Sequence, residues 1–151
     1  MLGYYKNIEA TQKAIDSDGW YHTGDLATMS SSTGHIFIRG RIKNMLLGAN
    51  GQNIYPEEIE DKLSSLPYVT ECVVIQKGEH LYGLVYTDPE DIRQGGLSEA
   101  ALAAQMEKNR QDLNQAVPAY ARLHAIRQVT EEFEKTPKKS IKRYKYKDYP
   151  V

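Results

Sequence analysis

Residues 48–60 read GANGQNIYPEEIE and organise the middle of this chain. Asn50 and Gly51 form a dipeptide that tight hairpin turns favour, because both residues tolerate a positive φ. Short runs with apolar residues lie on both sides of this turn, which predicts a β-hairpin. Pro56 then suits the first position of a helix, where its missing N–H costs nothing. The segment therefore predicts a hairpin that leads directly into a helix.

The helix that begins at Pro56 has one apolar face. Ile59, Leu63 and Leu66 recur at helical spacing, and Pro67 predicts the end of the helix. This face can pack against a sheet, if the following residues supply one.

After this helix the chain alternates between strands and a further helix. Residues 69–76 and 80–87 are rich in apolar and β-branched side chains, which predicts two strands joined by a turn. Ser98 is a favoured N-cap for a helix that reaches about residue 116, and residues 123–129 alternate like a third strand. This order predicts an α+β fold, a small domain with a β-hairpin and a three-stranded sheet packed by helices.

The first 40 residues are shorter in pattern and richer in turns. We expect a helix at residues 8–15, a short strand at 20–22 and another strand at 35–39. Gly40 interrupts the last strand pattern and is interpreted as a domain boundary. The predicted domains are therefore residues 1–40 and 41–151.

The charge of the chain is unevenly distributed. The 151 residues have a net charge of −1, but residues 135–151 contain seven Lys and Arg side chains against Asp148 alone. The tail is therefore +6, and the remaining residues carry −7. A cationic tail on an acidic body indicates an anionic partner. We expect the tail after Glu134 to be mobile until such a partner binds.

The cysteine content and the apolar runs bear on the cellular context. Cys72 lies in an apolar run with no neighbouring histidine or basic residue, so we expect a buried thiol rather than a nucleophile. One cysteine cannot form an intrachain disulfide, which fits a reducing compartment. No apolar run is long enough to span a membrane and no signal-peptide pattern is present, so we expect a cytoplasmic protein.

Residues 19–25 read GWYHTGD. Taken alone, Asp25 is a common turn residue, but a carboxylate beside a glycine can also accept hydrogen bonds from both hydroxyls of a ribose. The whole heptapeptide resembles the ribose-binding motif of the acyl-adenylate-forming enzymes, which include acyl-CoA synthetases, peptide-synthetase adenylation domains and luciferases. The resemblance implies that Asp25 binds the ribose of ATP, with Tyr21 and Thr23 as further nucleotide-binding residues.

Two further segments resemble motifs of the same family. Residues 40–44, GRIKN, resemble its hinge motif, in which Arg41 would contact the nucleotide and Lys43 would be the hinge. A guanidinium suits this contact because it donates hydrogen bonds in a planar fork. Residues 48–60 resemble the signature whose hairpin glycine lets the pantetheine arm of CoA pass, so Gly51 is the implied CoA-binding residue.

The family ends with a motif whose last lysine is catalytic, and residues 135–143, KTPKKSIKR, match it imperfectly. Alignment on Ser-x-Lys assigns the role to Lys142, whereas counting from Thr136 reaches Ser140, with Lys139 beside it. A lysine acts here as a point cation that stabilises charge on carboxylate and α-phosphate oxygens. Lys142 and then Lys139 are the candidate catalytic residues.

The resemblance covers the whole chain and is to the C-terminal lid of an AMP-forming acyl-CoA synthetase, of the long-chain fatty-acid type by the wording of the hairpin. It implies that residues 1–40 end a large N-terminal catalytic domain, which would supply the phosphate loop and bind Mg2+. The implied substrates are ATP, CoA and a fatty acid, joined through an acyl-adenylate. The isolated chain would be inactive.

Other functions stay open at this point. The irregular lysine motif allows a non-catalytic interaction module that keeps the lid fold, and an acyl carrier protein could replace CoA as the acceptor. Tyrosines between the tail lysines are compatible with peripheral membrane contact. They also suit nucleic acid, but the acidic body would repel phosphates, and we expect no nucleic-acid binding. The four histidines lack metal-ligand spacing, so no metal site is expected.

Overall fold

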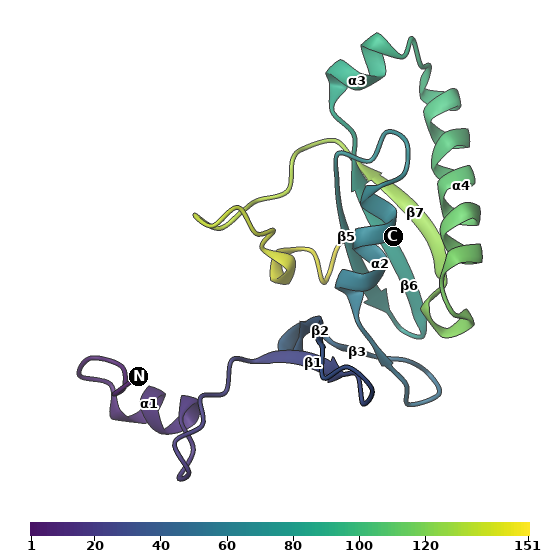
Figure 1. Cartoon of the computed structure of the whole chain (residues 1–151). Helices are drawn as coiled ribbons and strands as arrows, with labels where there is room; N and C mark the ends of the chain where they lie inside the picture. Colours follow the sequence, from purple (N-terminus) through teal and green to yellow (C-terminus); the bar gives the residue numbers. More distant parts are fainter. The chain divides into compact units, whose positions relative to one another are not determined.

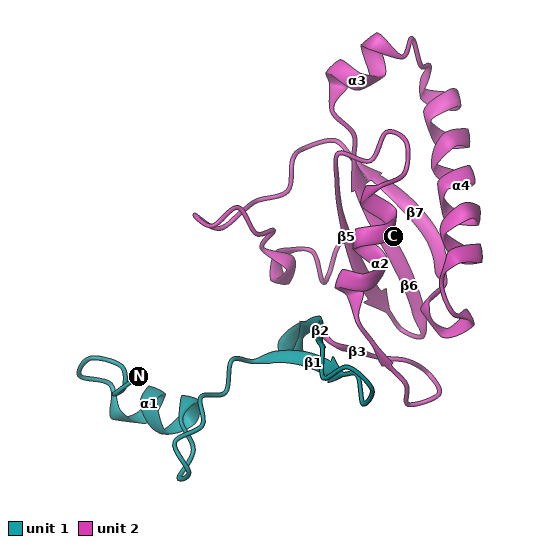
Figure 2. Ribbon diagram, viewed as in Figure 1, with its two compact units in different colours: residues 1–44 teal, residues 45–151 magenta.

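The computed structural model describes residues 1–151 as two compact units, residues 1–44 and residues 45–151 (Figures 1 and 2). The units differ in their packing. None of residues 1–44 is buried, whereas residues 45–151 contain every buried side chain. No helix in either unit has the length and apolar character needed to cross a membrane.

The first unit contains one helix and one two-stranded sheet. Helix α1 (Ile8–Ala14) begins after Asn7, whose side chain accepts a hydrogen bond from the amide of Ala10. Strands β1 (Asp25–Met29) and β2 (Ile36–Arg41) pair antiparallel. A short 3-10 helix, η1 (Ile42–Asn44), follows β2.

Two predictions for this unit need correction. Gly40 does not interrupt β2, because a bulge opposite Leu26 and Ala27 keeps Gly40 within the ladder. Residues 20–22 do not form a strand, since only Tyr21 makes an isolated bridge, to Ile15.

The second unit opens with the predicted hairpin and helix. Strands β3 (Leu46–Leu47) and β4 (Asn53–Ile54) pair antiparallel. Helix α2 (Pro56–Ser64) follows, with Pro56 at its start and acidic residues in its first turn. The three-stranded sheet contains β5 (Glu71–Lys77), β6 (His80–Tyr86) and β7 (Leu123–Val129) in that order. This architecture confirms the predicted α+β class.

The connection between β6 and β7 returns the chain so that these strands run parallel. It contains α3 (Pro89–Gln94), α4 (Glu99–Ala116) and the 3-10 helix η2 (Ala119–Ala121). Ser98 caps α4 as predicted, with its hydroxyl accepting from the amide of Ala101. Helix α3 was not predicted, although Asp88 and Pro89 are suitable cap and first residues for it.

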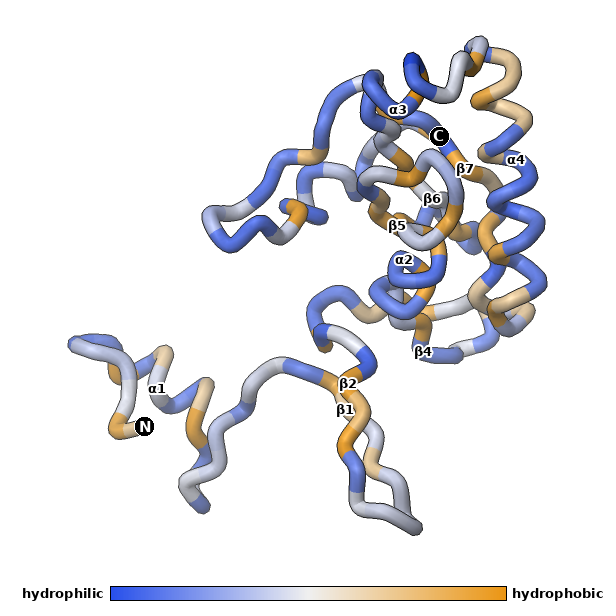
Figure 3. Tube along the Cα trace, turned by 45° about the horizontal axis from the view of Figure 1, so that its top comes forward, coloured by the Kyte–Doolittle hydropathy of each residue, from blue (hydrophilic) through white to orange (hydrophobic).

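The sheet of the second unit buries both of its faces. Successive residues of β5 alternate between two apolar clusters, as strand geometry requires. One cluster lies between the sheet and the helices and includes Leu63, Val74 and Leu113. The other includes Val73 and Phe133 and is joined by residues of the C-terminal tail. Hydrophobic colour in Figure 3 accordingly recurs on the strands and along α4.

The C-terminal tail packs against this second face, so the prediction of a mobile tail is wrong. The ring of Phe133 meets that of Tyr146 edge-on, with 4.9 Å between centroids. Tyr146 and Tyr149 pack on the second cluster, and a 3-10 helix, η3 (Arg143–Lys145), directly precedes Tyr146 in the chain. Apolar and aromatic burial therefore orders a segment whose composition alone suggested a solvated tail.

The charge of the tail is also largely matched within the domain. Four of its cations pair with carboxylates of the same unit: Lys135 with Glu71 and Glu132, Lys142 and Lys145 with Glu134, and Arg143 with Glu60 and Glu57. The anionic partner indicated by the charge pattern is therefore in part the domain itself.

Candidate functional site

The first unit brings three of the predicted nucleotide-binding residues together. Asp25 begins β1 and Arg41 ends β2, and the antiparallel register places them opposite each other. Nη1 of Arg41 lies 3.0 Å from Oδ1 of Asp25 and donates a 3.0 Å hydrogen bond to the carbonyl of Thr23. Gly24 permits this arrangement because its φ is +77°, a left-handed value that suits glycine. The Thr23–Asp25 turn thus folds around the guanidinium.

This cluster keeps groups available for a ligand. The Asp25 side chain is 36% exposed and that of Arg41 is 59% exposed. The carboxylate of Asp25 has several lone pairs and can accept hydrogen bonds from hydroxyl groups in addition to its contact with Arg41. The Thr23 hydroxyl accepts a 3.1 Å hydrogen bond from the amide of Asp25, which orients the turn. Exposed carboxylate and guanidinium groups side by side can bind vicinal hydroxyls and phosphate oxygens.

Tyr21 is not joined to this cluster by a hydrogen bond. Its hydroxyl lies 3.5 Å from that of Tyr4, and this hydrogen bond raises the pKa of Tyr4. The turn before Tyr21 depends on Asp16, which was not among the predicted site residues. Its carboxylate accepts from the amide of Trp20 at 2.8 Å and lies 3.1 Å from Nε2 of His22. The hydrogen bond from Trp20 is the main cause of the lowered pKa of Asp16.

The residue predicted as the hinge lies in η1. Lys43 is exposed, its side chain makes no hydrogen bond or ion pair, and it is the penultimate residue of the first unit. A side chain without partners places little restraint on the backbone at this position.

Gly51 lies in the turn of the β3–β4 hairpin with a φ of +73°. Its amide donates to the carbonyl of Gly48 at 2.9 Å, and a Cβ built on Gly51 would have no atom within 4 Å. A Cβ on Gly48, by contrast, would lie 3.2 Å from Cδ1 of Ile54. Gly51 is therefore needed for the backbone conformation and leaves the surface of the turn open, whereas Gly48 is needed for packing.

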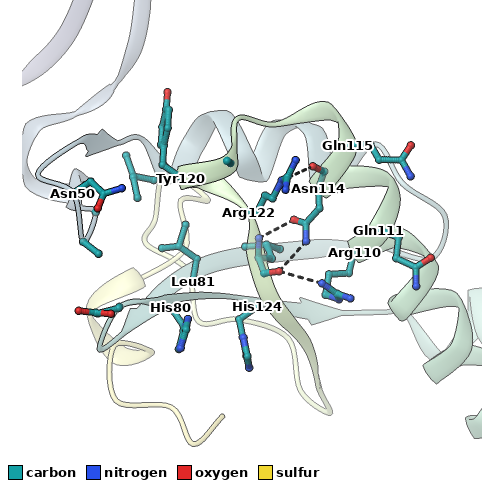
Figure 4. Close-up of a pocket in the computed structure, with 16 residues that line it drawn as sticks. Asn50, His80, Leu81, Arg110, Gln111, Asn114, Gln115, Tyr120, Arg122 and His124 are labelled. Carbon is teal, nitrogen blue, oxygen red and sulfur yellow. Dashed lines mark hydrogen bonds between the residues drawn. The ribbon is translucent and has the colours of Figure 1, made fainter.

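A polar cavity of about 710 Å3 lies beside this hairpin and was not predicted (Figure 4). It is lined by residues of the hairpin turn, the start of β6, the last turns of α4 and the start of β7. Asn114 joins α4 to β7 by accepting from the amide of Leu123 at 2.8 Å and donating to its carbonyl at 2.9 Å. Arg122 uses Nε to bind the carbonyl of Asn114 at 3.1 Å, which leaves the end of its guanidinium for other acceptors. Residues so far apart in the chain give no sequence motif.

Two histidines stand together at the same cavity. The rings of His80 and His124 stack with centroids 4.6 Å apart. His124 is the extra residue of a bulge, because Leu81 pairs with Leu123 and Tyr82 pairs with Ala125. Across the cavity Arg110 binds Glu107, and this hydrogen bond lowers the pKa of Glu107 to about 2. No group of three or more His, Cys, Asp or Glu side chains is arranged to hold a metal ion.

The two candidate catalytic lysines differ in their surroundings. Nζ of Lys142 lies 3.2 Å from Oε2 of Glu134, which Lys145 also binds. Hydrogen bonds from Lys145 and then Lys142 lower the pKa of Glu134. Lys139 is exposed at the tip of the preceding turn, with a φ of +62°. Lys142 thus has a carboxylate partner that it must leave to reach a ligand, and Lys139 has none.

Comparison with known proteins identifies the class. A family model described as the AMP-binding enzyme C-terminal domain matches residues 43–149, which is more than half of the chain. The chain therefore belongs to this family. The match begins at the predicted hinge residue, Lys43, and ends at Tyr149 in the tail.

Individual relatives are acyl-CoA ligases and adenylating enzymes. The chain is 47% identical over 83 residues to a putative acyl-CoA synthetase, YngI, of Bacillus subtilis, covering 55% of the chain and 15% of the relative. It is 45% identical over 75 residues to the human mitochondrial medium-chain acyl-CoA ligase ACSF2, covering 50% of the chain and 12% of the relative.

A solved structure extends the likeness to almost the whole chain. The adenylation domain of a carboxylate reductase from Mycobacterium chelonae matches with a TM-score of 0.83 and 25% identity, over 96% of this chain and 24% of that one. The chain thus spans about a quarter or less of the length of each of these proteins. It has the fold of the C-terminal lid of an acyl-CoA synthetase.

Proposed function

We propose that this chain is the C-terminal part of an ATP-dependent fatty acyl-CoA ligase and closes over an active site that an upstream domain completes. The observation that carries the proposal is Arg41, which joins Asp25 and Thr23 into one exposed polar cluster in a chain of the AMP-binding enzyme C-terminal family. The fatty acid as substrate rests on sequence resemblance, whereas a cytoplasmic location and peripheral membrane contact rest on the composition of the sequence; all three are parts of the proposal.

The first half-reaction would form an acyl-adenylate. A carboxylate oxygen of the acid attacks the α-phosphorus of ATP, and the bond to the β-phosphate oxygen breaks to release pyrophosphate. Asp25 would accept hydrogen bonds from the ribose hydroxyls, and Arg41 would hold the carboxylate of Asp25 in place and contact the nucleotide. Lys142, or Lys139, would stabilise the negative charge that develops on the acid and α-phosphate oxygens.

The second half-reaction would form the thioester. The sulfur of CoA attacks the acyl carbon, AMP leaves with the electron pair of its bond, and the thiol proton passes to solvent. The open surface at Gly51 would allow the pantetheine arm to pass, since no side chain approaches it. The cavity beside the hairpin offers Arg122 and amide groups, which suit the phosphate-bearing end of CoA. Rotation about Lys43 would exchange the two faces of the lid.

An upstream domain is part of the proposal because the first unit cannot form a core alone. Its strands expose large apolar side chains, including Met29, Ile36 and Ile38, each at least 69% exposed. An exposed apolar strand face of this kind is normally covered by another layer. That domain would also supply the phosphate loop and the ligands for Mg2+, so we expect the isolated chain to be inactive.

Exchange of labelled pyrophosphate into ATP by the full-length protein, with a panel of carboxylic acids, tests the proposal. We expect exchange with fatty acids, and Lys142→Ala or Lys139→Ala should slow it. No exchange with any carboxylate would contradict the proposal. If exchange occurs but neither lysine variant slows it, the tail is a non-catalytic element. Trapping the product on CoA or on an acyl carrier protein identifies the acceptor.

A further inference from the structure

Arg143 joins the C-terminal tail to the body of the second unit. Its Nη1 and Nη2 atoms donate to the two carboxylate oxygens of Glu60, which lies 83 residues earlier on α2. The Arg143 and Glu60 side chains are only 17% and 13% exposed. Burial has the largest single effect on the Arg143 pKa and lowers it, but the hydrogen bond to Glu60 and the negative charges of Glu60 and Glu57 together outweigh burial, so the pKa is raised. This is a bidentate and nearly buried ion pair, less exposed than the neighbouring pairs of Lys142 and Lys145 with Glu134.

The same pair also completes the edge of the sheet. Strand β5 is an edge strand, and the amide and carbonyl of Val74 point away from its only neighbour, β6. Oε1 of Glu60 accepts from the amide of Val74 at 2.6 Å, and Nη1 of Arg143 donates to the carbonyl at 3.1 Å. Side chains thus take the place of a further strand at this point, so the position of Arg143 is determined relative to both α2 and β5.

A lysine-bearing hairpin, residues 134–142, immediately precedes Arg143. Its ends are joined by a 2.8 Å hydrogen bond from the amide of Lys142 to the carbonyl of Glu134, and its turn by one from Lys139 to Thr136. The N-terminal arm of the hairpin starts beside the buried Phe133, and the amide of Glu134 donates to the hydroxyl of Tyr146 at 2.8 Å. The hairpin is therefore held at both bases while its lysines stay at the surface.

We propose that Arg143 is a positioning residue for the catalytic lysine of the first half-reaction. It acts by holding the 134–142 hairpin in one register against α2 and β5, and the proposal rests on the proposed function. The fork of the guanidinium is essential to this role. A lysine at position 143 would keep the charge, but it could not bind both oxygens of Glu60 and the Val74 carbonyl in one plane.

The two half-reactions separate positioning from a general loss of structure. In the full-length protein we expect Arg143→Met to slow acyl-adenylate formation roughly 10- to 100-fold, because small misplacements of a catalytic group have effects of this size. The change should lie in kcat, with the KM for ATP unaltered. Thioester formation from supplied acyl-adenylate should be unchanged, since it uses the Gly51 hairpin. The rate of acyl-adenylate formation by Arg143→Lys should lie between the rates of the wild type and Arg143→Met.

Leu63→Ala is the matched control. Leu63 lies on the same helix as Glu60, but it packs in the apolar cluster between the sheet and the helices, away from the tail. At a temperature where every variant is folded, it should leave both half-reactions close to wild type. Parallel losses in both half-reactions for Arg143→Met, or full adenylation activity, would overturn the proposal. Slow adenylation by Lys142→Ala together with normal adenylation by Arg143→Met would overturn it while leaving the proposed function intact.

Amide hydrogen exchange provides a measurement that does not need activity. In Arg143→Met the amides of Thr136, Lys139 and Lys142 should exchange at least about tenfold faster, because they depend on local order of the hairpin, and amides of β6 should not. A full-length protein that neither exchanges pyrophosphate nor forms a thioester would refute the proposed function. Independently of that result, wild-type rates of amide hydrogen exchange in the 134–142 hairpin of Arg143→Met would refute the anchoring by Arg143.

Discussion

Gly51 allows the strongest test of the thioester step, because its two structural properties can be separated. Its φ of +73° favours glycine, and the space around a built Cβ is empty. In Gly51→Ala the only expected cost to folding is therefore backbone strain, about 1–2 kcal/mol for an ordinary residue in the left-handed region. A domain with a stability of about 5–15 kcal/mol tolerates this loss. We expect a folded protein that still forms acyl-adenylate but is slow to form the thioester.

Gly51→Asn distinguishes strain from obstruction. Asparagine adopts the left-handed conformation more readily than alanine, but its side chain is larger. If the side chain blocks the pantetheine arm, Gly51→Asn should be the more stable of the two variants in urea and the slower in thioester formation. Pyrophosphate exchange should remain near wild type in both. Thioester formation by Gly51→Asn at the wild-type rate would refute the role of Gly51 as an open passage.

Three further predictions concern the second unit. Leu63 has no exposed surface, so Leu63→Ala should lower the free energy of unfolding by about 2–5 kcal/mol. Urea denaturation should show this as a lower midpoint with an unchanged m value. Burial raises the pKa of Cys72 from 9.0 to about 12, so the thiol ionises at lower pH in the unfolded chain than in the folded one. Between pH 9 and about pH 12 the free energy of unfolding of the wild type, relative to Cys72→Ala, should therefore fall by about 1.4 kcal/mol per pH unit. The same pH dependence in both proteins would contradict the burial of the thiol. Trypsin should cut the folded chain after Lys138 or Lys139, at the exposed turn, before Arg143, as mass spectrometry of early fragments can show; first cleavage at Arg143 would contradict its anchored position.

The helices and strands of the second unit followed from local sequence. Pro56 begins α2 and Ser98 caps α4 as expected, because helix starts depend on backbone preferences and hydrogen bonds within a few residues of the chain. The strands were predictable from alternating apolar residues, and β5 indeed places successive side chains in opposite clusters. The Asp25 and Arg41 cluster was predicted only through family resemblance, and the antiparallel pairing of β1 and β2 explains their contact.

The order of the C-terminal tail could not be predicted from local sequence. Its lysines and tyrosines suggest solvent exposure, since no property of residues 135–151 identifies the carboxylates that they meet. The partner of Arg143 is Glu60, 83 residues away, and the contact exists because α2 and β5 bring Glu60 to the sheet edge. The cavity beside Gly51 likewise combines segments from four parts of the chain.

The sequence alone determined the caps, turns and apolar periodicity of this protein, because these depend on backbone preferences over a few neighbouring residues. Only the tertiary structure decided that the sheet is covered on both faces and that the cationic tail is matched by the acidity of its own domain. Contacts between distant residues require chain closure, and their energy depends on the burial and geometry that the completed fold creates.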